Sequence, residues 1–196
     1  MANDAQAGEI LPPQLEGGSL YAVLLFRGDY TTWDWAFFVP DASKAPMGSA
    51  GSLFHVANVP SLGSAGRWAF EMDSTVDFHA STETVAMVRL ADLHGLGSFA
   101  DVVQELSATF NTVDTTNTHP AEFSSRLWFI EAICVLHDCG FVTCEDAWLL
   151  ERELKRYAFN AMDSYLEGGG SFFVYVLLLA CSVHLGYKLF KSGHCS

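Results

Sequence analysis

The sequence predicts an α+β domain in which an antiparallel sheet of about five strands is followed by about three helices. The first observation is that residues 33–71 contain three aromatic-rich segments of strand character, WDWAFFV, GSLFHV and RWAFE. The second is that the spacing of apolar residues changes to a helical period after Ser98. Because the connections between the strands are short and show no helical pattern, an antiparallel meander is the simplest topology. Strands that precede helices in this way are typical of α+β folds.

The strands are expected at residues 20–27, 33–39, 51–57, 67–72 and 85–90. The first contains YAVLLF, which is continuously apolar and indicates burial on both faces. The second is rich in aromatic side chains and is ended by Pro40. In the third strand, alternation places Leu53 and His55 on one face and Phe54 and Val56 on the other.

The helices are expected at residues 98–110, 121–138 and 145–162. Pro120 suits the first turn of the second helix, and Gly140 suits a left-handed stop after it. The spacing of Thr143 and Asp146 predicts a capping box at the start of the third helix. The inward face of the second helix is predicted to carry Leu127, Ile130, Cys134 and Val135.

The composition of the chain excludes some classes of partner. Half of the residues are hydrophobic, which is ample for a core, and 23 Asp and Glu stand against 10 Lys and Arg. Nucleic acid is therefore not expected as a partner, because binding it requires a basic face. The five cysteines are an odd number without the spacing of a disulfide framework, which favours a reduced, intracellular compartment.

The predicted organisation is a disordered arm, an α+β globular domain, a Gly-rich hinge, a transmembrane tail anchor and a short basic tail, at residues 1–18, 19–165, 166–171, 172–190 and 191–196. The apolar run begins at Phe172 and meets its first charged side chain at Lys188, which can snorkel so that the span reaches Phe190. The lipid bilayer is thus an expected partner, with the body facing the cytosol at an intracellular membrane. A buried C-terminal helix or strand pair is the alternative, because His184 and Gly186 interrupt the run.

Few residues are candidates for chemistry. His55 lies in the middle of a strand among aromatic residues, where a histidine satisfied by a neighbouring group is the commoner role. Asp34 lies between two tryptophans and must either reach solvent or accept hydrogen bonds. Ser124 and Ser125 fit cap or first-turn positions better than the role of nucleophile. The aromatic side chains expected at the centre of the sheet, and around any pocket there, are Trp33, Trp35, Trp68 and Trp128.

Cys134, Cys139 and Cys144 are spaced five residues apart, which matches no common zinc spacing. His137 lies between them, so a metal site is conceivable, but the spacing favours none. Cys134 belongs to the predicted apolar face, where a thiol acts as a small core side chain. No phosphate-binding glycine loop occurs in the sequence, and no cofactor is expected.

The segments WDWAFFVP, GSLFHV, WAFE and SSRLWFIEAICVL together resemble a group of small fungal proteins, over about residues 20–160. That pattern in turn resembles the permuted papain-like proteins of the lecithin:retinol acyltransferase and H-Ras-like suppressor families. The resemblance implies a papain-like fold in which a His on a strand precedes a Cys at a helix N-terminus. It also implies a C-terminal hydrophobic anchor, which several members carry.

The matching positions in this chain hold different residues, with Asp34 in place of the His and Ser125 in place of the Cys. A thiolate mechanism needs a sulfur of lowered pKa beside a base, and an Asp–Ser pair supplies neither. The sequence therefore favours a non-catalytic protein that binds a protein partner or small ligand between sheet and helix. The alternative is a membrane-tethered acyltransferase or hydrolase that uses Ser125 or a Cys, with His55 as the base.

Overall fold

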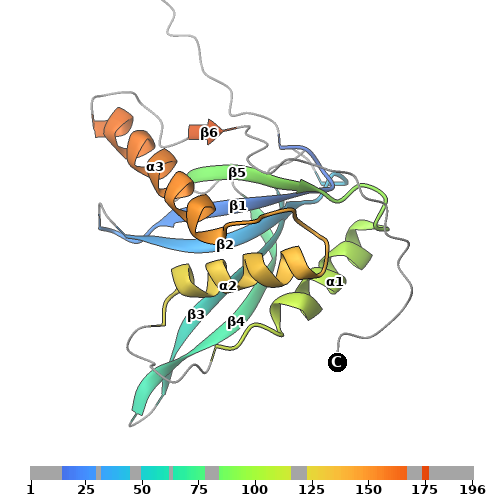
Figure 1. The fold of residues 1–196 in the computed structure, drawn as a ribbon, viewed down its shortest axis with the longest axis horizontal. Coiled ribbons are helices and arrows are strands. Elements are labelled where there is room, and N and C mark those ends of the chain that lie inside the picture. The colour runs from blue at the N-terminus through green and yellow to red at the C-terminus, as the bar shows by residue number, and fades with distance from the viewer. Residues whose placement is uncertain are drawn as a thin grey trace, which may run out of the picture.

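The computed structural model describes residues 15–29, 32–44, 50–61, 64–77, 84–115, 123–166 and 174–176. In chain order the elements are β1 (Ser19–Phe26), β2 (Trp33–Pro40), β3 (Ala50–Ser61), β4 (Ser64–Asp77), β5 (Thr84–Asp92), α1 (Phe99–Phe110), α2 (Ser125–Asp138), α3 (Ala147–Leu166) and β6 (Val174–Val176). The helices pack on one face of the sheet (Figure 1). The prediction of a five-stranded antiparallel sheet followed by three helices is confirmed.

The strand order in the sheet is β4-β3-β2-β1-β5-β6. The first four strands form the expected meander, but β5 is antiparallel to β1 and not to β4. The prediction of a simple meander is therefore wrong for β5. This placement buries β1 between two neighbours, and residues 20–24 of β1 are fully buried, as its continuously apolar sequence predicts.

Alternation along the strands divides the buried side chains into two clusters. Trp35, Phe37 and Phe54 point to the helices, where the ring of Phe37 stacks on Phe129 of α2 at 4.6 Å and on Phe110 of α1 at 4.8 Å. A smaller cluster on the opposite face of the sheet contains Leu15, Tyr21, Val23, Ala36, Phe38, Leu53 and Met87. The predicted division of the third strand is confirmed, since Leu53 and Phe54 fall in different clusters.

The helix ends differ in part from the prediction. Helix α2 begins at Ser125, with the hydroxyl of Ser124 accepting a hydrogen bond from the N–H of Leu127, so this helix starts four residues later than expected. Pro120 lies outside the described residues. The carboxylate of Asp146 accepts from the N–H of Leu149 and caps α3, a role that the sequence suggested for Thr143.

After α2, Gly140 adopts a φ of 81° and ends the helix as predicted. The inward placement of Cys134 is wrong: this residue is exposed. Of the other predicted inward residues, Ile130 is buried, and Leu127 and Val135 are half-buried against the core. The full set of buried side chains in α2 is Ser125, Trp128, Phe129, Ile130, Ala132, Ile133 and Leu136. Helix α2 thus presents a broad face to the sheet, and Cys134 lies outside it.

Strand β6 is the element that the sequence did not predict. It pairs in parallel with β5, with Val174 opposite Ala86 and Val176 opposite Val88. Its three residues belong to the predicted membrane span, and residues 177–190 of that span lie outside the described part of the chain. In the described ranges, no helix has the length and apolarity needed to cross a bilayer.

Candidate functional site

The structure brings together the two residues that stand at the His and Cys positions of the resembled pattern. The hydroxyl of Ser125, at the first residue of α2, donates to the carboxylate of Asp34 in β2 over 3.2 Å. The same oxygen accepts from the backbone N–H of Trp35 over 3.3 Å. Ser125 is 2% exposed and its bond to the Trp35 N–H is buried, whereas its bond to Asp34 is only partly buried.

This contact forms because β3 runs beside only half of β2. Among the described residues, the pairs between the two strands extend from Phe37 to Pro40, and the first half of β2 has no partner on that side. The start of α2 fills this place, and Ser125 accepts the N–H of Trp35 that a neighbouring strand would otherwise bind. The serine therefore provides the acceptor for a backbone N–H at the unpaired edge of β2, where this strand meets α2.

Asp34 meets a second partner at the surface. The guanidinium of Arg27, near the end of β1, lies 3.4 Å from the same carboxylate oxygen that Ser125 contacts. The side chain of Asp34 is 44% exposed and that of Arg27 is 46% exposed, so this ion pair contributes little to stability. Both possibilities raised for Asp34 from the sequence hold, because the carboxylate reaches solvent and accepts a hydrogen bond.

His55 is not part of this contact. Because Phe54 and Val56 pack against the helices, alternation directs His55 to the opposite face of the sheet. Its Nε2 lies 3.2 Å from a carboxylate oxygen of Asp73 on β4. The structure thus brings Asp34 to Ser125 and separates His55 from both.

The Asp34–Ser125 pair is poorly suited to nucleophilic catalysis. A serine nucleophile is commonly activated by a neighbouring base such as histidine, and here the hydroxyl meets a carboxylate that also lies 3.4 Å from the guanidinium of Arg27. The hydroxyl is also buried, and its oxygen is already committed to the Trp35 N–H. The geometry is that of a structural hydrogen bond between a helix and a strand.

The four tryptophans proposed as pocket walls are core side chains. Trp33, Trp35 and Trp128 are buried, and Trp68 is half-buried with its ring 5.8 Å from that of Phe123. The indole nitrogens of Trp33 and Trp128 have no hydrogen-bond partner among the described residues. None of the four lines the groove that the structure contains.

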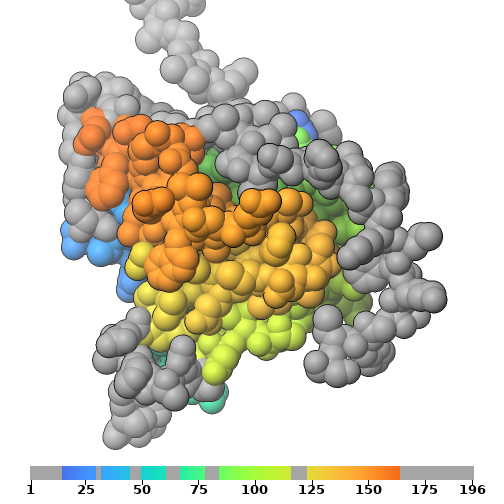
Figure 2. Space-filling view, in the orientation of Figure 1, coloured from blue at the N-terminus to red at the C-terminus, as the bar shows by residue number. Residues whose placement is uncertain are grey.

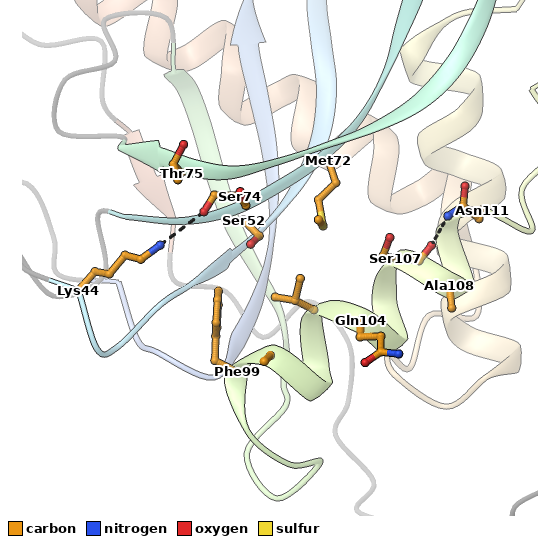
Figure 3. A pocket seen from close by; sticks show the side chains of 12 residues that line it. Lys44, Ser52, Met72, Ser74, Thr75, Phe99, Gln104, Ser107, Ala108 and Asn111 are labelled. Atoms are coloured by element: carbon orange, nitrogen blue, oxygen red, sulfur yellow. Dashed lines mark hydrogen bonds between the residues drawn. The ribbon is translucent and has the colours of Figure 1, made fainter.

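That groove lies between helix α1 and the helix-facing side of strands β3 and β4 and has a volume of about 710 Å³ (Figure 3). Met72 of β4 points into it from one side and Phe99 of α1 from the other (Figure 3). At one end, the ammonium group of Lys44 lies 3.5 Å from the Ser74 carbonyl and 3.5 Å from the carboxylate of Asp41. The groove therefore has an apolar middle and one end at which Lys44 is paired with Asp41.

The sequence did hold a signal for this groove. The apolar positions predicted for α1 are Phe99, Val102, Val103, Leu106 and Phe110. Three of them, Val102, Leu106 and Phe110, are buried, whereas Phe99 and Val103 are half-buried and line the groove. An apolar stripe wider than the core requires is one sign of a second contact surface.

Helices α2 and α3 lie side by side on the face seen in Figure 2. Two acids are buried among the described residues, Asp41 and Glu151, and Glu151 belongs to α3. Burial acts to raise the pKa of Glu151, but hydrogen bonds from Arg126 and Lys155 and their positive charges hold this pKa below its ordinary value. The guanidinium of Arg126 also lies 5.4 Å from the ring centroid of the exposed Trp148. This cluster joins α2 to α3.

The three described cysteines and His137 do not converge on a metal site. Cys134 is exposed, Cys144 is buried, and Nδ1 of His137 accepts from the backbone N–H of Cys144 over 3.2 Å. Within the described ranges, no group of three or more His, Cys, Asp or Glu side chains could hold a metal ion. His137 fixes the turn between α2 and α3 through this hydrogen bond.

Comparison of the chain with family models, with curated proteins and with solved structures finds no match. The resemblance to the permuted papain-like families stays a prediction from the sequence motifs.

Proposed function

We propose that this chain is a non-catalytic protein with a papain-like order of elements, which binds a protein partner or small ligand in the groove between α1 and the sheet. The observation that carries the proposal is the hydrogen-bonded position of Ser125. Its hydroxyl is buried, directed at Asp34 and engaged with the N–H of Trp35. A contact of this kind supports a structural role where the resembled pattern has its nucleophile.

The groove supports the proposal that the protein binds a partner or small ligand. Its volume is within the range of ligand sites in proteins, and apolar side chains from α1 and β4 converge on it. Met72 is 39% exposed there and shares the groove with the half-buried Phe99 and Val103, so three large apolar side chains are gathered at one surface. The groove and the Asp34–Ser125 contact lie at different elements, so binding does not depend on chemistry at Ser125.

We also infer a membrane anchor in residues 172–190, with the body in the cytosol at an intracellular membrane. The run has no charged side chain before Lys188, and the residues before it carry the whole excess of acid over base. An acidic body is repelled by an anionic lipid surface, so attachment would depend on the span itself. The pairing of Val174–Val176 with β5 favours the alternative in which the start of this run packs on the sheet.

The alternative function is a membrane-tethered acyltransferase or hydrolase with Ser125 or a Cys as nucleophile and His55 as base. It requires the imidazole to reach the hydroxyl, and alternation directs His55 to the other face of the sheet, where it meets Asp73. The geometry therefore favours binding over acyl transfer.

A fluorophosphonate acyl probe tests the proposal, because it labels activated serines irrespective of the substrate. The purified chain is incubated with the probe between pH 6 and pH 9, and the intact mass is measured beside that of Ser125→Ala. We expect no added mass in either protein. A single adduct that is present in the wild type and absent in Ser125→Ala would overturn the non-catalytic function.

A further inference from the structure

Strand β4 forms one end of the sheet, so its outer edge has no paired strand among the described residues. The strand contains 14 residues, whereas strands in globular proteins average about 5 to 6. Edge strands are commonly protected by a lysine, a proline or a short length. The sequence WAFEMDSTVD, residues 68–77, contains neither lysine nor proline. The register of β4 with β3 shifts between Asp73 and Val76, so the regular part of this edge is the segment before Asp73, and that segment is open to a further strand.

The helix-facing side of this edge is the groove. Along β4 the side chains of Phe70, Met72 and Ser74 alternate toward the helices, and Met72 and Ser74 line the groove opposite α1. Neighbouring strands lie about 4.8 Å apart. A strand added to β4 would therefore place every second side chain over the space between Met72 and the half-buried Phe99 and Val103 of α1 (Figure 3).

The other side of the same edge is acidic. Glu71 and Asp73 share the face of β4 that points away from the helices, and both are exposed. Asp73 also contacts His55 of β3. Beyond Asp73 the register with β3 shifts, so that Val76 is the next residue of β4 packed on this face. Opposite charges on neighbouring strands stabilise the pairing, whereas like charges oppose it.

We propose that β4 accepts an extended peptide of a partner protein as an additional strand, and that this peptide alternates apolar with basic side chains. The apolar side chains enter the groove against Met72, and the basic ones meet Glu71 and Asp73 on the far face. The inference rests on the proposed function and names the class of partner that the groove binds. A second copy of this chain fits less well than a basic partner. An antiparallel pair of two β4 strands centred on Met72 would place Glu71 of one copy opposite Asp73 of the other, and these like charges oppose pairing.

The probe is an amidated, fluorescein-labelled peptide of about eight residues that alternates lysine and valine. A peptide that alternates glutamate and valine is its charge-reversed control. Fluorescence anisotropy with the full chain measures both. We expect the lysine peptide to bind, with an affinity that falls as salt is added, and the glutamate peptide to bind at least about tenfold more weakly.

Two N-methylated versions of the lysine peptide separate strand addition from simple attraction to an acidic protein. In an added strand, the N–H groups of alternate residues face β4, and those of the others face solvent. Methylation of all valines or of all lysines therefore has unequal effects. One version is expected to lose binding by at least about tenfold, because several hydrogen bonds are removed, and the other to bind within about threefold of the parent.

Matched variants locate the site. Met72→Thr keeps β propensity while shortening the side chain in the groove, and Leu96→Thr is its control at another exposed apolar residue. Glu71→Lys reverses one charge of the acidic face, and Glu145→Lys makes the same change before α3. We expect Met72→Thr and Glu71→Lys each to weaken binding severalfold and the two controls to leave it unchanged. Thermal unfolding of each variant shows whether its fold is retained.

Equal binding of the two methylated peptides, or equal effects of Glu71→Lys and Glu145→Lys, would overturn strand addition. Absence of binding by the lysine peptide would overturn it as well. Each of these outcomes is independent of the acyl-probe result, because peptide binding involves no reaction at Ser125. Failure of the strand-addition proposal is therefore distinct from failure of the non-catalytic function.

Discussion

The hydroxyl of Ser125 and the carboxylate of Asp34 are hydrogen-bonded over 3.2 Å although 91 positions separate them in the sequence. The contact joins the first residue of α2 to the first half of β2, which does not pair with β3. The resembled pattern has a nucleophile and a base at these two positions. In this chain the same proximity holds a helix on a strand.

Removal of the Ser125 hydroxyl is expected to cost stability. Ser125→Ala leaves the buried N–H of Trp35 without its acceptor, and we expect the free energy of unfolding to fall by about 2 kcal/mol. Urea unfolding measures the change. Ser19→Ala is the control, because the Ser19 hydroxyl is equally buried but has no partner among the described residues, so its loss is expected to be neutral or stabilising. Equal losses in the two variants would contradict the structural role of Ser125.

Glu151 is expected to make the protein sensitive to acid. Its pKa lies below the ordinary value of 4.5 because the hydrogen bonds and charges of Arg126 and Lys155 outweigh the effect of burial. A lowered pKa contributes stability above pH 4.5, and this contribution is lost as the pH falls from 4.5 through the lower pKa of the folded state. Glu151→Gln should therefore lower stability at pH 7 by about 2 kcal/mol and flatten the dependence on pH below 4.5.

The control is Glu153→Gln, at a position two residues after Glu151. This change removes the surface partner of Arg156. We expect Glu153→Gln to change the free energy of unfolding by less than about 1 kcal/mol at every pH. Urea unfolding between pH 3 and pH 7 compares the two variants. If the free energy of unfolding of Glu151→Gln depends on pH in the same way as that of the wild type, Glu151 is not the source of the acid sensitivity.

Glu131 is expected to act in the opposite direction. Burial, and then the charge of Asp114, raise the pKa of this carboxyl above its ordinary value of 4.5. A raised pKa opposes folding while the group is ionised, and this cost disappears as the pH falls below 4.5. Glu131→Gln should therefore stabilise the protein at pH 7, and the gain should shrink toward pH 4. Loss of stability at pH 7, measured by urea unfolding, would contradict the prediction.

Phe37 is expected to be a major source of stability in the core. Its ring stacks on those of Phe110 and Phe129 and so joins β2 to two helices. Phe37→Ala removes these contacts and opens a cavity, for which we expect a loss of about 4 kcal/mol. Leu96→Ala, at an exposed apolar residue, should change the free energy of unfolding by less than about 0.5 kcal/mol. Chemical denaturation of both variants tests the difference.

The parts of the fold that local patterns determine were predictable. The continuously apolar first strand, the opposite faces of Leu53 and Phe54, and the left-handed Gly140 follow from alternation and backbone preference. The position of β5 was not, because pairing with β1 or β4 depends on contacts far apart in the sequence. Cys134 was misplaced because α2 packs a broad face on the sheet, so that helical spacing alone does not identify its one exposed side.

The Asp34–Ser125 contact was predictable from the sequence, and the groove was not. Alignment with the resembled motifs selected Asp34 and Ser125, and the structure brings these two together. The groove was missed because it is built from surfaces of α1 and β4 that meet only after folding. Phe99 and Val103 carried the signal as apolar residues beyond the buried stripe, but nothing in their spacing indicates what they face.

The central claim is that Asp34 and Ser125 bind one another to hold α2 on β2. A double-mutant cycle of Asp34→Ala, Ser125→Ala and the combined variant measures this directly, since the contribution of Arg27 cancels in the cycle. Urea unfolding at pH 7 gives the four free energies. We expect a favourable coupling of about 1 kcal/mol. A coupling below about 0.3 kcal/mol, within the range of independent sites, would contradict it.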